Sequence, residues 1–204
     1  MQKTKQNADL TFKYNMDMGR HGWLRLTPAY SVKMVGQILS GLNYKPVGVL
    51  EPFSGTGTTE LVCANQGINS YAFDVNPFLV WLATTKTEIY SEQTLNNFEK
   101  TYLEIAVSFN QYITSELPPI YNIERWWNKT QLDFLSRLKT AIWNVNDLNV
   151  KNLLKIAFCR LIISVSNDSF NHVSTSFKDS TEDNSFTPDI GRDLFLSYCK
   201  MIRA

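Results

Sequence analysis

A short apolar run followed at once by a glycine loop constrains the fold of this chain more than any other feature. The run Val47–Leu50 is short, apolar and β-like, and it ends in Glu51. The segment PFSGTGTTE comes next and leads into a helical stretch, Glu60–Asn65. Strand, glycine loop and helix in this order form the first half of a parallel β-loop-α-β unit.

The second half of that unit follows directly along the chain. Gly67 is placed to stop the helix, and Tyr71–Phe73 reads as a second short strand that ends at Asp74. Upstream, Ser31–Leu42 carries apolar residues at helical spacing, so we expect a helix before the first strand. The front of the chain is therefore expected to be α/β with parallel strands.

The remainder of the chain is expected to be a helical block. Pro118-Pro119 is expected to break one helix, and Asn128 or Thr130 to cap the next. Helical spacing covers four stretches: residues 78–87, 92–115, 130–145 and 148–165. We expect a single domain over residues 1–204 with four parts: a βαβ region (20–90), the helical block (91–165), a polar loop (166–191) and a terminal helix (192–204).

Composition excludes several classes of protein. The 204 residues are 44% hydrophobic and 19% charged, and no apolar run approaches the ~20 residues of a membrane span. The N-terminus lacks an apolar signal core, so we expect a cytoplasmic protein. Three widely spaced cysteines and two histidines predict neither a disulfide nor a metal site. The net charge of +1 argues against non-specific coating of nucleic acid, although residues 1–50 hold seven Lys or Arg against two Asp.

The glycine loop predicts a ligand that approaches the backbone closely. Gly55 and Gly57 carry no β-carbon to collide with it, and the following helix start offers free N–H groups. The loop lacks the GK[ST] of a Walker A motif, and Glu60 stands where the third glycine of a dinucleotide fingerprint would be. The acidic Glu51 at the strand end would repel phosphate and favours a ligand with a positive charge.

Asp74 is placed to bind a ribose. It follows Gly57 by 17 residues, close to the interval of about 20 at which an acidic side chain meets ribose hydroxyls in βαβ nucleoside sites. Val75 and Phe78 are candidates to flank an adenine ring, although apolar residues beside a strand are also ordinary core residues.

These segments resemble the S-adenosylmethionine-dependent DNA amino-methyltransferases, which modify adenine N6 or cytosine N4. EPFSGTGTT is similar to the family's cofactor motif I, D-P-F-x-G-S-G-T-T, with Glu51 in place of Asp. Asp74-Val75-Asn76-Pro77 resembles the motif II region, and residues 20–31 resemble motif X, which contacts the methionine end of the cofactor. The resemblance implies S-adenosyl-L-methionine as cofactor and a Rossmann-like methyltransferase fold, here with an incomplete sheet and a large helical block.

The cofactor-binding residues that this resemblance implies come from all three motifs. They are Thr27, Pro28, Ala29 and Tyr30, then Glu51, Pro52, Phe53, Ser54, Gly55, Thr56 and Gly57, and finally Asp74, Val75 and Asn76.

The catalytic tetrapeptide of such enzymes, [DNS]-P-P-[YFW], is absent from these 204 residues. In the family its polar residue and aromatic ring hold the flipped base. The chain's one Pro-Pro pair lies in Leu117-Pro118-Pro119-Ile120, which offers neither group. The stretch Ser166–His172 has acceptors and an aromatic ring but no prolines, and is better suited to face DNA or a subunit. We therefore expect no catalytic residue in this chain.

Three functional hypotheses remain open. In the first, the chain is the cofactor-binding half of a split methyltransferase acting on double-stranded DNA, and a second subunit carries the Pro-Pro loop and the target recognition. In the second, it is a truncated or degenerate homologue that binds cofactor without catalysis. In the third, it belongs to an RNA or protein methyltransferase. Where the missing strands should pack we expect an exposed sheet edge, so the chain should aggregate, dimerise or bind a partner tightly.

Two further features have competing interpretations. His21 could reach a substrate or make a structural hydrogen bond. The pair Trp126-Trp127 could stack on bases or anchor a core.

Overall fold

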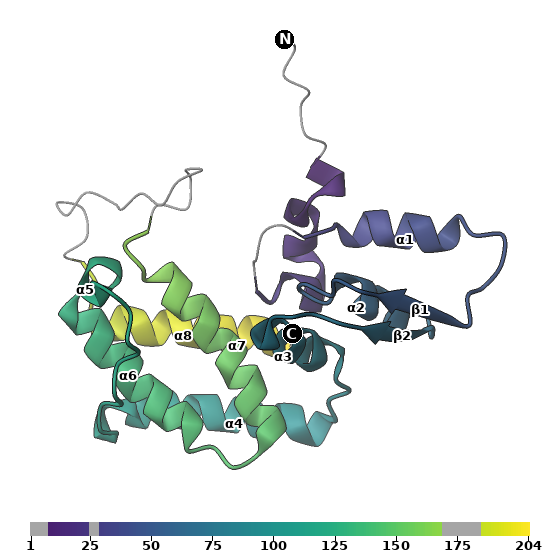
Figure 1. Cartoon of the computed structure of the whole chain (residues 1–204). Coiled ribbons are helices and arrows are strands. Elements are labelled where there is room, and N and C mark those ends of the chain that lie inside the picture. Colours follow the sequence, from purple (N-terminus) through teal and green to yellow (C-terminus); the bar gives the residue numbers. More distant parts are fainter. Residues whose placement is uncertain (1–7, 25–28, 169–184) are drawn as a thin grey trace, which may run out of the picture. The chain divides into compact units, whose positions relative to one another are not determined.

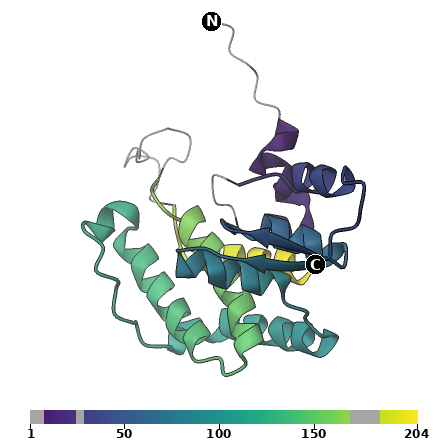
Figure 2. The same cartoon turned by 45° about the vertical axis from the view of Figure 1, so that its right-hand side comes forward.

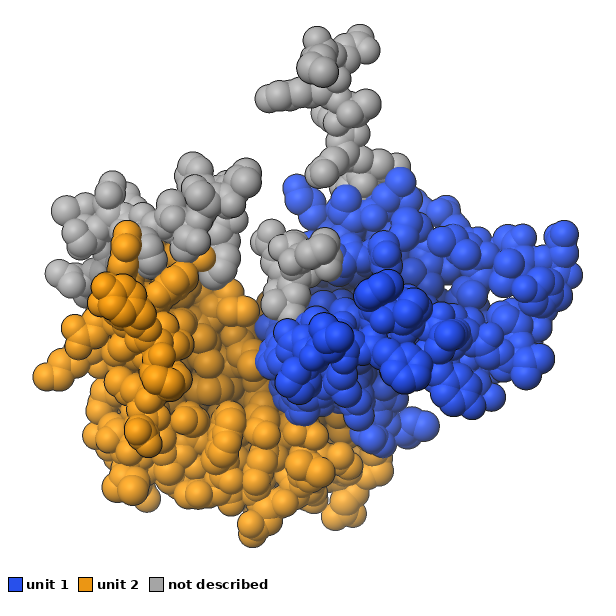
Figure 3. Space-filling view, in the orientation of Figure 1, with its two compact units in different colours: residues 1–89 blue, residues 90–204 orange. Residues whose placement is uncertain are grey.

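The computed structural model describes residues 8–24, 29–168 and 185–204 and contains two compact units (Figure 1). The first unit is Met1–Ile89 and the second is Tyr90–Ala204, coloured separately in Figure 3. The border falls one residue before the predicted end of the βαβ region at residue 90. That the whole chain is one methyltransferase-like domain stays a prediction.

The first unit has a short helical N-terminal segment followed by the expected β-loop-α-β order. Its elements are three 3₁₀ turns (Ala8–Leu10, Phe12–Asp17 and Gly19–Gly22), α1 (Val32–Ser40), β1 (Gly48–Glu51), α2 (Thr58–Asn65), β2 (Asn69–Ala72) and α3 (Pro77–Thr87). Ser31 caps α1, because its side chain accepts a hydrogen bond from the Met34 N–H at 3.0 Å. Gly67 has a φ of +63° directly after α2, as expected of a helix stop.

The two strands pair in parallel, with Gly48 opposite Asn69 and Glu51 opposite Ala72 (Figure 2). The ladder continues one step further, because the Phe73 N–H donates to the Glu51 carbonyl at 2.9 Å. The sequence placed the second strand at Tyr71–Phe73, whereas β2 begins two residues earlier. The polar residues Asn69 and Ser70 carry no β signal of their own, and pairing with β1 makes them a strand.

The small sheet is covered by helices on one face. Helix α2 packs against both strands, and α1 and α3 pack against α2. The other face carries Leu50 and Tyr71, which are 66% and 68% exposed. The described chain is mostly helical with a two-stranded parallel sheet, which is compatible with a methyltransferase-like α/β fold.

The second unit is all helical. Its elements are α4 (Glu92–Ser108), a 3₁₀ turn (Phe109–Gln111), α5 (Ile123–Trp126), α6 (Lys129–Trp143), α7 (Leu148–Ser164) and α8 (Pro188–Arg203). Helix α7 contacts α4, α6 and α8, and its Leu153, Leu154 and Leu161 are completely buried. Asn128, one of the two predicted caps, forms a capping box with Gln131 at the start of α6. Within the described ranges, no helix is both long and apolar enough to cross a membrane.

Two predicted helix boundaries in this unit are wrong. Helix α4 ends at Ser108 and a 3₁₀ turn ends at Gln111, so the helix predicted over 92–115 is too long and Pro118-Pro119 does not break it. The terminal helix begins at Pro188 rather than Arg192, because Thr187 caps it and proline suits the first helical turn. The polar loop predicted over 166–191 is therefore shorter, and its residues 169–184 lie outside the described part.

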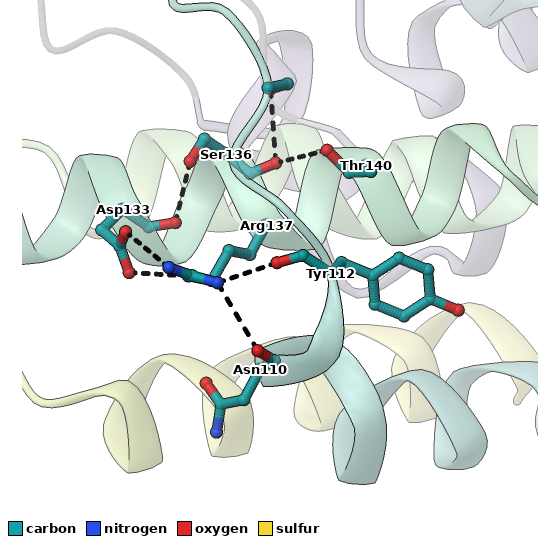
Figure 4. A network of polar contacts seen from close by, with 7 residues as sticks. Asn110, Tyr112, Asp133, Ser136, Arg137 and Thr140 are labelled. Atoms are coloured by element: carbon teal, nitrogen blue, oxygen red, sulfur yellow. Dashed lines mark hydrogen bonds and ion pairs between the residues drawn. The ribbon is translucent and has the colours of Figure 1, made fainter.

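Residues 110–120, the segment that contains Pro118-Pro119, are tied to α6 by polar contacts of the first half of the segment, residues 110–115 (Figure 4). Arg137 is the centre of this network, since its guanidinium pairs with Asp133 at 2.9 Å and donates to the Tyr112 carbonyl at 2.8 Å. Ser115 Oγ adds a hydrogen bond to the Ser136 carbonyl at 3.3 Å. These contacts give the segment a structural role within the second unit.

Two helical glycines predict opposite responses to alanine. A β-carbon on Gly191 of α8 would lie 2.7 Å from the Phe134 ring and 2.8 Å from the Phe186 ring, whereas one on Gly36 of α1 would meet nothing within 4 Å. Overpacking costs about 1–3 kcal/mol, and alanine gains about 0.5–1 kcal/mol in an open helix. We expect Gly36→Ala to raise the free energy of unfolding and Gly191→Ala to lower it, as measured by urea denaturation. A stabilising Gly191→Ala would contradict this packing.

Candidate cofactor site at the strand ends

The glycine loop between β1 and α2 is held in a conformation that only glycine adopts readily. Gly55 and Gly57 have φ values of +54° and +76°. A β-carbon on Gly57 would also lie 2.9 Å from both Cα and Cβ of Ala83 in α3. The loop therefore packs directly on α3, and α2 begins immediately after Gly57 with its free N–H groups at the loop.

Two carboxylates lie at the carboxyl ends of the paired strands and fasten the loop. Asp74 Oδ2 accepts a hydrogen bond from the Gly55 N–H at 2.9 Å, and its Oδ1 accepts one from the Asn76 N–H at 2.8 Å. Glu51 Oε1 accepts from the Phe53 N–H and Oε2 from the Thr59 hydroxyl, both at 3.0 Å. Each oxygen keeps a lone pair for a further donor, so the pair can receive ligand hydroxyl or ammonium groups.

Of the other residues predicted in motifs I and II, some have exposed side chains and others have buried ones. Pro52, Phe53, Val75 and Asn76 are exposed, with Phe53 80% accessible beside the loop. Ser54 and Thr56 are buried, so their side chains pack inside the unit beneath the loop backbone and do not face solvent. Asn76 also caps α3, since its side chain accepts from the Phe78 N–H at 3.0 Å.

The segment predicted as motif X is described in part. Thr27 and Pro28 lie outside the described residues, Ala29 is half-buried and Tyr30 is mostly exposed. The Tyr30 backbone is held by Asn15, whose buried amide donates to the Tyr30 carbonyl at 2.8 Å and accepts from the Val32 N–H at 2.7 Å. Asn15 is a positioning residue that the sequence did not single out.

The His21 side chain does not make the predicted structural hydrogen bond within the described residues. The side chain is buried, and both ring nitrogens lack a hydrogen-bond partner among the described residues. Burial, together with the nearby charge of Lys86, lowers the pKa of His21 to about 4. The imidazole is therefore neutral at physiological pH and acts as a packing group. Its neighbour Arg20 donates to the Lys86 and Glu88 carbonyls at 3.0 and 2.6 Å, closing the end of α3.

A cavity of about 220 Å³ opens beside the loop, between β2, α2 and α3. Its polar lining comes from Ser54, Glu60, Ser70, Asp74, Thr84 and Thr87, and the remainder from Ala64, Ala72, Val80 and Ala83. Glu60 is 6% exposed, and burial raises the pKa of its carboxyl. Glu60 stands out in the sequence only because it replaces a glycine, and Lys86 does not stand out at all; both are buried here.

The cysteines and acidic groups offer no metal-type chemistry in the part of the chain that the structure describes. No three His, Cys, Asp or Glu side chains there gather closely enough to hold an ion. The three cysteines are unpaired, and burial raises the pKa of each thiol, that of Cys159 to about 11. The thiols are therefore protonated near neutral pH.

Comparison with known proteins finds relatives of a single kind. Type II methyltransferase M.BsoBI of Geobacillus stearothermophilus is 31% identical over 98 residues, which cover 47% of this chain and 19% of that protein. M.MvaI of Kocuria varians is 24% identical over 123 residues (57% and 27%), and M.MjaII of Methanocaldococcus jannaschii is 40% identical over 63 residues (31% and 12%). Part of this chain is related to Type II DNA methyltransferases.

The resemblance drawn from the three motifs is confirmed at this level. The relatives are methyltransferases of restriction-modification type, and the chain spans between 12% and 27% of their lengths. No family model matches the chain, and no solved structure matches it. The assignment of individual residues to the methyltransferase cofactor site therefore stays a prediction, which the following variants test.

Gly57 and Gly67 separate backbone strain from loop packing. Both have positive φ, but only Gly57 would place a β-carbon against α3. Left-handed backbone costs a non-glycine residue about 1–2 kcal/mol, and overpacking adds about 1–3 kcal/mol. We expect Gly67→Ala to lower the free energy of unfolding in urea by the backbone cost alone and to keep its affinity for S-adenosylhomocysteine. Gly57→Ala should lower the free energy of unfolding by both costs and should lose that affinity. Equal losses in the two variants would contradict close packing of the loop.

Proposed function

We propose that this chain is the cofactor-binding part of a site-specific DNA amino-methyltransferase, which transfers a methyl group from S-adenosylmethionine to adenine N6 or cytosine N4 in double-stranded DNA. The observation that carries the proposal is that Glu51 and Asp74 both lie at the carboxyl ends of the paired strands, where each accepts hydrogen bonds from the loop that contains Gly55 and Gly57. The similarity to Type II methyltransferases supports the same reaction class.

Each group at the strand ends has a counterpart in that cofactor. Asp74 has free lone pairs to accept hydrogen bonds from ribose hydroxyls. Glu51 has the charge to attract the ammonium and sulfonium of the methionine part, which a phosphate-binding loop would not need. Val75 and Phe78, the candidates to flank the adenine ring, are both exposed, and Phe53 adds exposed apolar surface beside the loop.

Residues 27–30 would complete the methionine end of the site. Their proposed role rests on the motif X resemblance, and it is supported by Asn15, which holds the Tyr30 backbone at the start of α1. The cofactor supplies an electrophilic methyl on its sulfonium. The chain's own contribution is to bind and orient that group for in-line attack by the base nitrogen.

The groups that would hold the base are proposed to come from a second subunit. These 204 residues contain no [DNS]-P-P-[YFW] tetrapeptide, and Pro118-Pro119 lies in the segment that Arg137 ties to α6. On its own, the chain would bind cofactor without methylating DNA. The second subunit would carry the catalytic loop and the target recognition.

The open face of the sheet is where that subunit would dock. Parallel sheets in α/β proteins are normally covered on both faces, whereas Leu50, Tyr71 and Phe73 are each more than 60% exposed. Helices packed on that face, together with strands paired to the free edges of β1 and β2, would complete a Rossmann-like sheet. Without them, the exposed surface favours aggregation or self-association of the isolated chain.

A second candidate function is cofactor binding without catalysis, by a truncated or degenerate homologue. The absent tetrapeptide favours it, and an RNA or protein methyltransferase is the remaining alternative. Methylation assays that mix the chain with proteins encoded beside it and carrying [DNS]-P-P-[YFW] separate these possibilities, because only the split enzyme would then methylate DNA.

Removing the charge of Asp74 tests the cofactor site. Hydrogen bonds to charged groups contribute about 1.5–3 kcal/mol, so Asp74→Asn should weaken binding of S-adenosylhomocysteine at least about tenfold in isothermal titration calorimetry. Glu104→Gln on the exposed face of α4 is the matched control and should bind like the wild type. An unchanged affinity in Asp74→Asn would argue against this ribose site.

Charges on the open sheet face test the docking surface. We expect Leu50→Asp with Tyr71→Lys to leave the fold intact, because both side chains are exposed and the opposite charges face each other across the two strands, but to abolish methylation in the mixture with the second subunit. Ile38→Asp on α1, a position that is 60% exposed, is the control and should keep activity. If the double variant still supported methylation, the second subunit would not dock on the open sheet face.

A further inference from the structure

Lys86, near the end of α3, is a buried lysine with a defined target. Lys86 is only 2% exposed. Its Nζ donates a hydrogen bond to the Thr56 carbonyl at 3.0 Å and a longer one to the His21 carbonyl at 3.5 Å. A buried ammonium is costly unless it is hydrogen-bonded or paired, so this arrangement has to be balanced by its contacts. One of those contacts is the cofactor loop itself.

Glu60 supplies the opposing charge. It lies in the first turn of α2, and both of its carboxylate oxygens are buried without a hydrogen-bond partner among the described residues. Burial lowers the pKa of Lys86 to about 8, and the charge of Glu60 opposes that shift. The charges of the two side chains are thus coupled through space.

The contacts of the loop fix two of its peptide planes. The Gly57 N–H donates to the Ser54 carbonyl at 3.0 Å, while the Thr56 carbonyl of the same peptide unit accepts from Lys86. The preceding Ser54–Gly55 unit is fixed in the same way, because its N–H donates to Asp74. Each of these two units is held at both its N–H and its carbonyl.

The peptide unit between them is the one that remains available. Neither the Gly55 carbonyl nor the Thr56 N–H makes a hydrogen bond within the described residues. With its two neighbours fixed, this unit can face a ligand without rearrangement, which lowers the cost of binding. Asp74 holds the peptide unit before the Gly55–Thr56 unit, and Lys86 holds the peptide unit after it.

Lys86 also links the loop to the N-terminal segment. Its side chain reaches the His21 carbonyl, and its own carbonyl accepts from Arg20 at 3.0 Å. The start of the motif X segment is thereby held against the same lysine that holds the motif I loop.

We propose that Lys86 is a positioning residue for the cofactor loop: it fixes the Thr56–Gly57 peptide unit, so that the adjacent Gly55–Thr56 unit faces the ligand, while Glu60 provides its counter-charge. This inference rests on the proposed function for the identity of the ligand, but the geometry of the loop can be measured without one.

Three variants separate positioning from charge balance. Lys86→Met keeps the length of the side chain and removes its donors, Glu60→Gln removes the counter-charge, and the double variant removes both buried charges. Lys100→Met on α4, where the lysine side chain is 77% exposed, is the control. Amide hydrogen exchange at Gly55 and Gly57, followed by NMR, reports the loop, and calorimetry with S-adenosylhomocysteine reports binding.

We expect Lys86→Met to speed exchange at Gly57 and to weaken S-adenosylhomocysteine binding, each about tenfold, the effect of losing one hydrogen bond to a charged group. The double variant should recover the urea midpoint of the wild type but neither the slow exchange nor the affinity. Recovery of all three would show that Lys86 only balances Glu60, and wild-type exchange in Lys86→Met would also overturn the proposal. If the wild-type chain binds no S-adenosylhomocysteine, the proposed function fails, while the exchange data still decide the role of Lys86.

Discussion

Parallel pairing of β1 with β2 is the interaction on which the candidate site depends. The register places Glu51 opposite Ala72 and carries on through Phe73, so that Glu51 and Asp74 leave the sheet at the same edge. The loop after β1 then needs only local contacts to both carboxylates to acquire its shape. A slip of this register would separate the two carboxylates and release the Gly55 N–H, so four residue pairs determine the chemistry of the whole edge.

Local signals made much of the first unit predictable. The apolar run, the glycines and the stop at Gly67 each require a particular backbone conformation, and the structure has them in the expected order. The end of α4 was less predictable, because apolar spacing continues into the 3₁₀ turn, where Phe109 is buried with its ring 4.9 Å from that of Phe134. The spacing of apolar residues indicates which side chains are buried, and side chains are still buried in the 3₁₀ turn after the helix has ended.

The site itself divides in the same way. Glu51, Gly57 and Asp74 were visible in the sequence because a motif fixes their spacing along one chain segment. Lys86 was not, since a lysine in a helix is ordinarily solvated and its burial depends on how closely the loop packs on Ala83. The role of Asn15 was also not visible in the sequence, because its two hydrogen-bond partners lie 15 and 17 residues away and no local pattern indicates them.

In the proposed split enzyme, the open sheet face would couple cofactor binding to docking of the second subunit. Two strands are marginally stable alone, so β1 and β2 depend on α2 on one face, while Leu50 and Tyr71 remain in solvent on the other. Burying each of these side chains under a second subunit would contribute about 1.5–3 kcal/mol. That cover would stabilise the same strand ends that hold Glu51 and Asp74, and so would favour the conformation that binds cofactor. Because such coupling is reciprocal, cofactor should tighten the association of the subunits by the same factor.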